Sequence, residues 1–253
     1  MAGIEHTAEV TVLVNKLVGA PVATLLQAIG VHHDPHMPIP NHVAGTWVVM
    51  LGLAAFSYFA GKRLQKTPRG LQNVLELFME FIYSLADDVI GHKGRRYVPL
   101  LATQAVFIAV GSAIGLVPFF SSPTASLCTT AALGLVVFVF YNAEGIRAHG
   151  LGAYLAHFAG PKLAWYMFPI RMLMVPIELV SHCARPFSLA LRLFANIFGD
   201  DVILVILFGL VGLFVIPVQP LMFLAIFKAF VQAYIFVMLT SVYLGGAVAE
   251  EEH

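Results

Sequence analysis

The fold is decided by residues 176–201, PIELVSHCARPFSLALRLFANIFGDD, which carry ionisable side chains inside an otherwise apolar helical run. At 100° per residue, Glu178, Arg185, Arg192 and Asn196 fall within about 40° of one another on a helix surface, spread over roughly 27 Å of its axis. The other faces are mainly Leu, Ile, Phe and Val. Because ionisable groups at bilayer depth are costly, they are expected to face protein or a water-filled cavity and to mark an ion pathway.

Arg192 is the strongest candidate for a functional residue on this face. Arginine stays protonated at any accessible pH, whereas a desolvated lysine can lose its charge. A fixed cation inside a membrane can meet a carboxylate from a partner, displace its proton and block the leakage of other protons. The structural alternative is an arginine that pairs with Glu178 or extends to the membrane surface. Two arginines two turns apart, with polar residues on the same face, favour the functional interpretation.

Composition indicates an all-α polytopic membrane protein. Of the 253 residues, 59% are hydrophobic and only 11% are charged, whereas soluble domains have about 25% charged residues. The formal net charge of zero gives no basis for nucleic-acid binding. Cys128 and Cys183 lie in apolar segments, which predicts buried free thiols rather than a disulfide framework.

The apolar runs predict one membrane domain, residues 44–253, behind an outside N-terminal segment, residues 1–43. Within residues 1–43 we expect a short amphipathic helix on the membrane surface. Residues 70–90 alternate apolar and acidic positions at helical spacing, which predicts an amphipathic helix along the cytoplasmic interface. Five spans are predicted at about 44–61, 97–119, 125–142, 170–212 and 219–246.

The distribution of lysine and arginine predicts the orientation. Seven of these residues fall within 62–96 and three within 147–171, whereas only Lys16 falls in a segment predicted to be outside. Because cytoplasmic loops collect Lys and Arg near helix ends, the N-terminus is expected outside and the C-terminus in the cytoplasm. The last two spans exceed the roughly 20 residues of a perpendicular span, so they must tilt or run beside another protein. Pro176 and Pro186 are positions where the first of them can bend or break.

Two motifs on these last helices, ARPFSLALRLFANIFGDD at 184–201 and FVQAYIFVMLTSVYL at 230–244, resemble subunit a of F-type ATP synthases. The resemblance is strongest over residues 170–246, and the two motifs together are far more specific than either alone. It implies a membrane stator beside the rotating c-ring, with the last two helices as a steeply tilted hairpin along the ring. The implied partners are the c-ring, the b subunits of the peripheral stalk, the rest of the F1FO ATP synthase and lipid, with no cofactor. A bacterial inner membrane is the expected location.

The resemblance also implies roles for individual residues. Arg192 matches the essential arginine, which separates two aqueous half-channels and meets the c-subunit carboxylate. Gln232 matches the glutamine that supports this arginine, and Asn196 matches an asparagine near the same contact. The other matching positions are Glu178 and Ser188 on the cytoplasmic-side path, Asp201 in the outer half-channel and Tyr243 at the inner end of the last helix. Asn196 and Gln232 are equally compatible with ordinary interhelical hydrogen bonding.

Lys228 departs from the family pattern, because an uncharged or acidic residue is more usual at its position. A second cation near Arg192 would hinder the release of a ring carboxylate, so we expect Lys228 to pair with Asp200 or Asp201 across the hairpin. Which aspartate lines the outer path is left open. His182 is interpreted as a packing histidine, although histidine titrates in the range that proton transfer needs.

The predicted function is ion translocation coupled to c-ring rotation and ATP synthesis, without catalysis by this chain. A secondary ion transporter is the alternative, but it would usually show inverted repeats and broken helices in both halves. A membrane enzyme with a histidine metal site is less compatible still, because the cluster His32, His33, Asp34 and His36 lacks a standard zinc spacing and predicts a solvated loop. The sequence leaves H⁺ and Na⁺ open as the transported ion.

Overall fold

The structure, a computed structural model, describes most of the chain, namely residues 9–29, 38–62, 65, 70–115, 122–152, 154, 168–211 and 218–248. These residues are almost entirely helical. In chain order the helices are α1 (Glu9–Ile29), α2 (Asn41–Lys62), α3 (Leu71–Ile90), the 3-10 helix η1 (His92–Tyr97), α4 (Val98–Ile114), the 3-10 helix η2 (Pro123–Ala125), α5 (Leu127–His149), α7 (Phe168–Val211) and α8 (Val218–Val248). The histidine cluster predicted as a loop, residues 32–36, lies outside the described residues.

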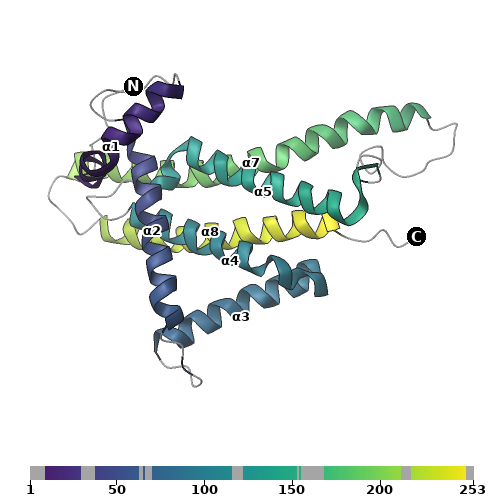
Figure 1. Cartoon of the computed structure of the whole chain (residues 1–253), viewed down its shortest axis with the longest axis horizontal. Coiled ribbons are helices and arrows are strands. Elements are labelled where there is room, and N and C mark those ends of the chain that lie inside the picture. Colours follow the sequence, from purple (N-terminus) through teal and green to yellow (C-terminus); the bar gives the residue numbers. More distant parts are fainter. Residues whose placement is uncertain are drawn as a thin grey trace.

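The long helices have two main directions. In Figure 1, α4, α5, α7 and α8 run side by side, and α2 crosses them. Helix α8 packs against α3, α4 and α5, and α5 also packs against α7. Because helices that cross in this way cannot all follow the bilayer normal, an upright α2 requires the other four to be strongly inclined in a membrane.

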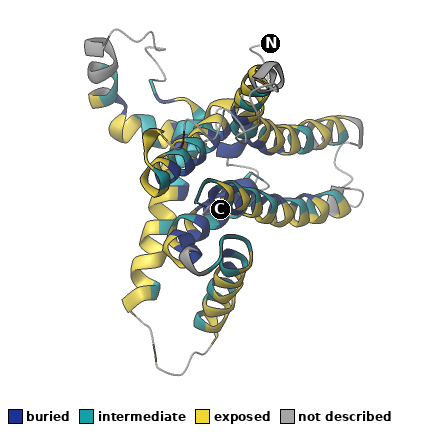
Figure 2. Cartoon of the chain, turned by 90° about the vertical axis from the view of Figure 1, so that its right-hand side faces the viewer, coloured by how far each residue is buried: buried dark blue, intermediate teal, exposed yellow. Residues whose placement is uncertain are grey.

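The core lies where these helices meet. Figure 2 shows the buried residues gathered between the helices and the exposed residues on their outward faces. Most of the largest fully buried side chains come from α4, α5, α7 and α8, and they include Leu101, Ile108, Val137, Leu193 and Phe236. One continuous apolar contact surface therefore fixes the position of α7 relative to α8.

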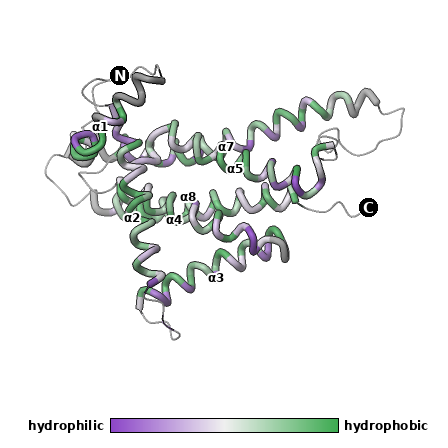
Figure 3. The backbone as a smooth tube through the Cα atoms, in the orientation of Figure 1, coloured by the Kyte–Doolittle hydropathy of each residue, from purple (hydrophilic) through white to green (hydrophobic). Residues whose placement is uncertain are grey.

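Four helices in the described part of the chain are long and apolar enough to cross a membrane. They cover Asn41–Lys62, Gly94–Ile114, Leu127–His149 and Pro220–Val248, and Figure 3 shows the hydrophobic residues along them. The polytopic all-α prediction is thus confirmed. The 44-residue α7 is not one of these four, so the count of five spans stays a prediction. Residues 70–90 do form a helix, α3, but its place at a membrane interface also stays a prediction.

Two helices end at other residues than the membrane spans predicted for them. The span predicted at 125–142 continues to His149, because Glu144 is buried and hydrogen-bonded rather than being the start of a polar loop. Arg147 therefore lies in the last turn of α5, not in the following loop. The span predicted at 97–119 ends as a helix at Ile114. Ser122 contacts α4 again, because its hydroxyl donates a hydrogen bond to the carbonyl of Gly111.

A glycine allows α5 and α7 to approach closely. A Cβ atom added at Gly134 on α5 would lie 2.8 Å from the carbonyl oxygen of Pro186 on α7. Helix α7 continues without a break through Pro176 and Pro186. The prolines therefore do not divide this helix, and the residues before and after them lie on one continuous element.

The prediction of buried thiols was wrong, because Cys128 and Cys183 are both exposed on the chain. In a membrane protein the outward faces of a helix are apolar as well, so an apolar neighbourhood in the sequence does not imply burial. A helix predicted within residues 1–43 is observed as α1, and its place at a membrane surface stays a prediction. The Asn15 side chain attaches it to the start of α2, since it accepts a hydrogen bond from the Ile39 amide and donates one to the Ile39 carbonyl.

Candidate functional site

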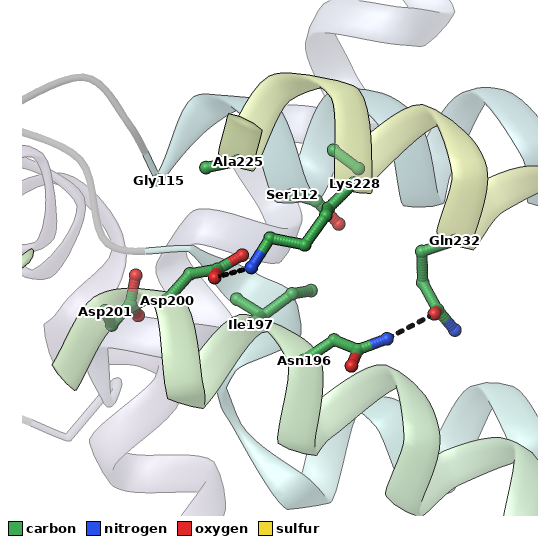
Figure 4. Close-up of a pocket in the computed structure, with 10 residues that line it drawn as sticks. Ser112, Gly115, Asn196, Ile197, Asp200, Asp201, Ala225, Lys228 and Gln232 are labelled. Atoms are coloured by element: carbon green, nitrogen blue, oxygen red, sulfur yellow. Dashed lines mark hydrogen bonds and ion pairs between the residues drawn. The ribbon is translucent and has the colours of Figure 1, made fainter. Parts of the chain in front are cut away.

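The α7–α8 cleft is the place where polar side chains of the last two helices converge (Figure 4). It covers about 370 Å³, part of which is open to the surroundings, and it has a third wall at the end of α4. Its lining residues are Ser112 and Gly115 beside α4, then Asn196, Ile197, Asp200 and Asp201 from α7, and Ala225, Lys228, Ala229 and Gln232 from α8. Residues of α7 and α8 that are 24 or more positions apart in the sequence therefore line one cleft.

At one end of the cleft, an interhelical hydrogen bond joins Asn196 to Gln232. The Asn196 amide nitrogen lies 2.6 Å from the Gln232 side-chain oxygen. Gln232 is only 3% exposed, and its own amide nitrogen has no hydrogen-bond partner among the described residues. A buried donor without a partner favours bound water or a further polar group at this point.

One turn along both helices, Lys228 forms an ion pair with Asp200 (Figure 4). The Asp200 side chain is 17% exposed and that of Lys228 is 39% exposed. Of the two alternatives for Lys228, the structure contains the pair with Asp200. Asp201 lines the same cleft as the next residue of α7.

Arg192 lies on an exposed part of α7, one turn before Asn196. Ser188, one turn earlier, is exposed as well. Among the described residues, no carboxylate lies within ion-pair distance of the Arg192 guanidinium. Its charge is therefore directed away from the helix bundle and is available to a group outside this chain.

A second polar group surrounds Arg185, about two turns before Arg192. The Arg185 guanidinium lies 3.8 Å from a Glu178 carboxylate oxygen. It also lies 5.5 Å from the centre of the Tyr243 ring on α8. The Glu178 and Arg185 side chains are each about one third exposed, at 39% and 34%, so this pair is open to solvent or to a partner.

His182 faces the opposite way, into the bundle. It is 7% exposed, and its Nε2 atom lies 2.9 Å from the Asn142 side-chain oxygen and 3.2 Å from the Tyr141 hydroxyl. Tyr154 also donates a hydrogen bond to the Asn142 oxygen, at 2.8 Å. These contacts agree with the interpretation of His182 as a packing histidine that fixes α7 against α5.

The structure thus separates the predicted residues into two groups along α7. Asn196, Asp200, Asp201, Lys228 and Gln232 meet in the α7–α8 cleft, and Glu178 and Tyr243 approach one another through Arg185. Arg192 and Ser188 lie exposed between the two groups.

Sequence reasoning missed several buried polar residues, among them Gln104, Ser112 and Glu144. Each interrupts an apolar run, and this was the signal that could have identified them. Of the three, only Ser112 lines the α7–α8 cleft. Among the described residues, no group of histidine, cysteine and carboxylate side chains is arranged to hold a metal ion.

Comparison with known proteins agrees with the two motifs. A family model described as "ATP synthase A chain" matches residues 43–245. The chain is 45% identical over 227 residues to "ATP synthase subunit a 1" of Syntrophotalea carbinolica, covering 90% of this chain and 93% of that protein. It is 44% identical to "ATP synthase subunit a" of Sulfurihydrogenibium sp., covering 84% and 99%, and 45% identical to "ATP synthase subunit a" of Helicobacter acinonychis, covering 84% and 93%. These similarities confirm the resemblance inferred from the sequence.

Proposed function

This chain belongs to the ATP synthase A chain family, and from that premise we propose that it is the membrane stator subunit of a rotary ATP synthase. In this role it provides two aqueous half-channels and an essential arginine, Arg192. Ion flow through the half-channels drives rotation of a c-ring, and rotation is coupled to ATP synthesis in other subunits. The chain itself catalyses no reaction and needs no cofactor.

The observation that carries the proposal is the exposed, unneutralised guanidinium of Arg192 between two polar groups on one helix. An arginine that faced its own bundle would need a carboxylate from this chain, since an unpaired buried charge is strongly destabilising. An outward-facing arginine can instead attract the carboxylate of a rotating c subunit and release its proton. It then prevents protons from passing directly between the two paths.

The α7–α8 cleft is our candidate for the outer half-channel. Asp201 is the proposed proton-exchanging carboxylate, because Asp200 is held by Lys228. The Lys228–Asp200 pair keeps the lysine charge away from Arg192. Asn196 and Gln232 then close the cleft on the side towards Arg192.

The exposed side of α7 that carries Glu178 and Ser188 is our candidate for the inner half-channel. Tyr243 lies beside this path through its contact with Arg185. The lysine and arginine distribution supports an outside N-terminus and a cytoplasmic C-terminus. The proposed location is a bacterial inner membrane, and the proposed partners are the c-ring, the peripheral-stalk b subunits and the rest of the F1FO complex. H⁺ is the proposed ion.

The test is ATP-driven proton pumping in inverted membrane vesicles that carry Arg192→Ala, with assembly of the complex checked by copurification. We expect loss of pumping with the complex intact. The control is Arg95→Ala, which removes an exposed arginine paired to Asp87 and far from α7 in the sequence, and which should pump normally. Normal pumping by Arg192→Ala would refute the proposal. If the alanine variant does not assemble, Arg192→Lys replaces it, and the same loss is expected because lysine can give up its charge.

Copurification also separates the proposal from a secondary transporter. In mild detergent, a stator subunit should retain a c-ring and a peripheral stalk. A transporter should purify alone and still move ions when reconstituted without other subunits.

A further inference from the structure

Two arginines from different helices converge on one buried carboxylate at the end of α5. Glu144 is 5% exposed and accepts a hydrogen bond from Arg147 at 2.7 Å. The second Glu144 oxygen lies 3.2 Å from the Tyr97 hydroxyl and 3.7 Å from the Arg96 guanidinium. One carboxylate therefore fixes the positions of Arg96, in η1 just before α4, and Arg147, in the last turn of α5.

The side chains of both arginines are largely exposed. The side chains of Arg96 and Arg147 are 69% and 68% exposed, although the carboxylate between them is buried. A guanidinium has five N–H donors, so the contacts with Glu144 leave several donors on each arginine. Two positive charges against one negative charge leave a net positive site. Positive charge and free N–H donors suit a phosphate group, which arginine binds through paired N–H donors.

The surroundings favour a phosphate that belongs to a lipid. Arg96 and Arg147 lie at the ends of two helices that are long and apolar enough to cross a membrane, Gly94–Ile114 and Leu127–His149. The ends of such helices reach the level of lipid headgroups. Close to Arg147 in the sequence, the apolar side chains of Ile146 and Leu151 are 36% and 60% exposed, and they could contact the acyl chains of a bound lipid.

We propose that Arg96 and Arg147, positioned by Glu144, form a binding site for the phosphate headgroup of an anionic membrane phospholipid. Both arginines belong to segments with the lysine and arginine excess of a cytoplasmic side, so the lipid comes from the inner leaflet. The site is independent of the α7–α8 cleft. A bound lipid would hold the start of α4 and the end of α5 together and stabilise that corner of the subunit.

Native mass spectrometry of the full-length chain in detergent tests this site. The chain is titrated with phosphatidylglycerol and, separately, with phosphatidylcholine, and the population of one-lipid complexes is measured. The test variant is Arg96→Gln combined with Arg147→Gln. The matched control is Arg95→Gln, because Arg95 is adjacent, equally exposed at 69%, and paired to Asp87 instead of Glu144.

We expect the wild-type chain to prefer phosphatidylglycerol over phosphatidylcholine. The double variant should weaken the tightest phosphatidylglycerol complex by about 10-fold, and Arg95→Gln should leave it unchanged. Equal weakening by Arg95→Gln would show nonspecific attraction to surface charge and overturn the proposal. Equal binding of the two lipids by the wild-type chain would overturn it as well.

A third measurement, competition with inorganic phosphate, distinguishes a site for a lipid from a site for a free anion. Inorganic phosphate in large excess should not displace phosphatidylglycerol, because it lacks acyl chains to contact Ile146 and Leu151. Full displacement would reassign the site to a small anion. If the double variant loses its helical circular-dichroism signal, Arg96→Gln alone decides the question. Arg96 lies farther from Glu144 than Arg147 does, so its removal disturbs the buried carboxylate less, and a weakening of about 3-fold or more is expected.

Discussion

Lys228 on α8 forms an ion pair with Asp200 on α7, and this pair joins the two helices one turn beyond the Asn196–Gln232 hydrogen bond. Lys228 is the only charged residue in the sequence of α8. Its charge is therefore already matched within the chain, although the family pattern predicts no cation there. The pairing also distinguishes two adjacent aspartates, since it engages Asp200 and leaves Asp201 to serve another role.

The Lys228–Asp200 pair should behave as a unit in proton pumping. We expect Lys228→Gln and Asp200→Asn each to reduce the pumping rate, because each leaves the other charge uncompensated in a partly buried position. The double variant should recover most of the activity. The Lys228 side chain is 39% exposed. The coupling free energy between Lys228 and Asp200, obtained from a double-mutant cycle, should therefore be only about 1 kcal/mol. A double variant as inactive as the worse single variant would argue against a functional pair.

Asp201 should be required for proton pumping even in a chain from which the Lys228–Asp200 pair has been removed. In the chain that already carries Lys228→Gln and Asp200→Asn, the further change Asp201→Asn should abolish ATP-driven pumping, because it removes the remaining carboxylate of the cleft. Asp201→Glu should retain measurable pumping. Pumping that survives Asp201→Asn would transfer the proton-exchanging role to another group, and assembly is checked by copurification in each case.

The Asn196–Gln232 hydrogen bond should matter more for function than for stability. Interhelical hydrogen bonds in membranes contribute about 0.6 kcal/mol on average, and Gln232→Leu also removes a buried amide nitrogen without a partner. We therefore expect Gln232→Leu to leave the thermal midpoint of the purified chain nearly unchanged while it lowers proton pumping clearly. A large fall in the midpoint together with normal pumping would make this contact purely structural.

Gln104 should be replaceable by an apolar residue. It is 5% exposed within α4, and both polar atoms of its side chain lack a hydrogen-bond partner among the described residues. An unsatisfied buried polar group costs about 1–3 kcal/mol, so Gln104→Leu should raise the free energy of unfolding, measured by chemical denaturation in detergent. Destabilisation would instead reveal a bound water or a hydrogen bond to a partner subunit.

Gly134 should tolerate no side chain at the contact between α5 and α7. Gly134→Ala would place a Cβ atom 2.8 Å from the Pro186 carbonyl oxygen, and such overpacking costs about 1–3 kcal/mol. The matched control is Gly52→Ala on α2, where a Cβ atom would meet nothing within 4 Å. That change should be neutral or stabilising by up to about 1 kcal/mol through helix propensity. Equal thermal midpoints for the two variants would contradict the close approach.

The sequence by itself determined the class, the family and the order of the helices. Apolar runs, helical periodicity and the two motifs around Arg192 and Gln232 are local properties of the chain, so they can be read without coordinates. The same local signals mark Glu178, Asn196 and the two aspartates as unusual residues in apolar helices. Local signals did not show that α5 continues to His149, because burial of Glu144 depends on Tyr97, which lies 47 residues away.

Only the tertiary structure decided which polar groups meet. The choice of Asp200 over Asp201 as the partner of Lys228 depends on the rotation of α7 relative to α8, and no residue spacing fixes this rotation. The crossing of α2 over the other helices, the contact of Arg96 with Glu144, and the outward exposure of both cysteines likewise depend on which faces of the helices pack together. Helix packing is set by the summed fit of side chains far apart in sequence, so these relationships emerge only when the whole bundle is assembled.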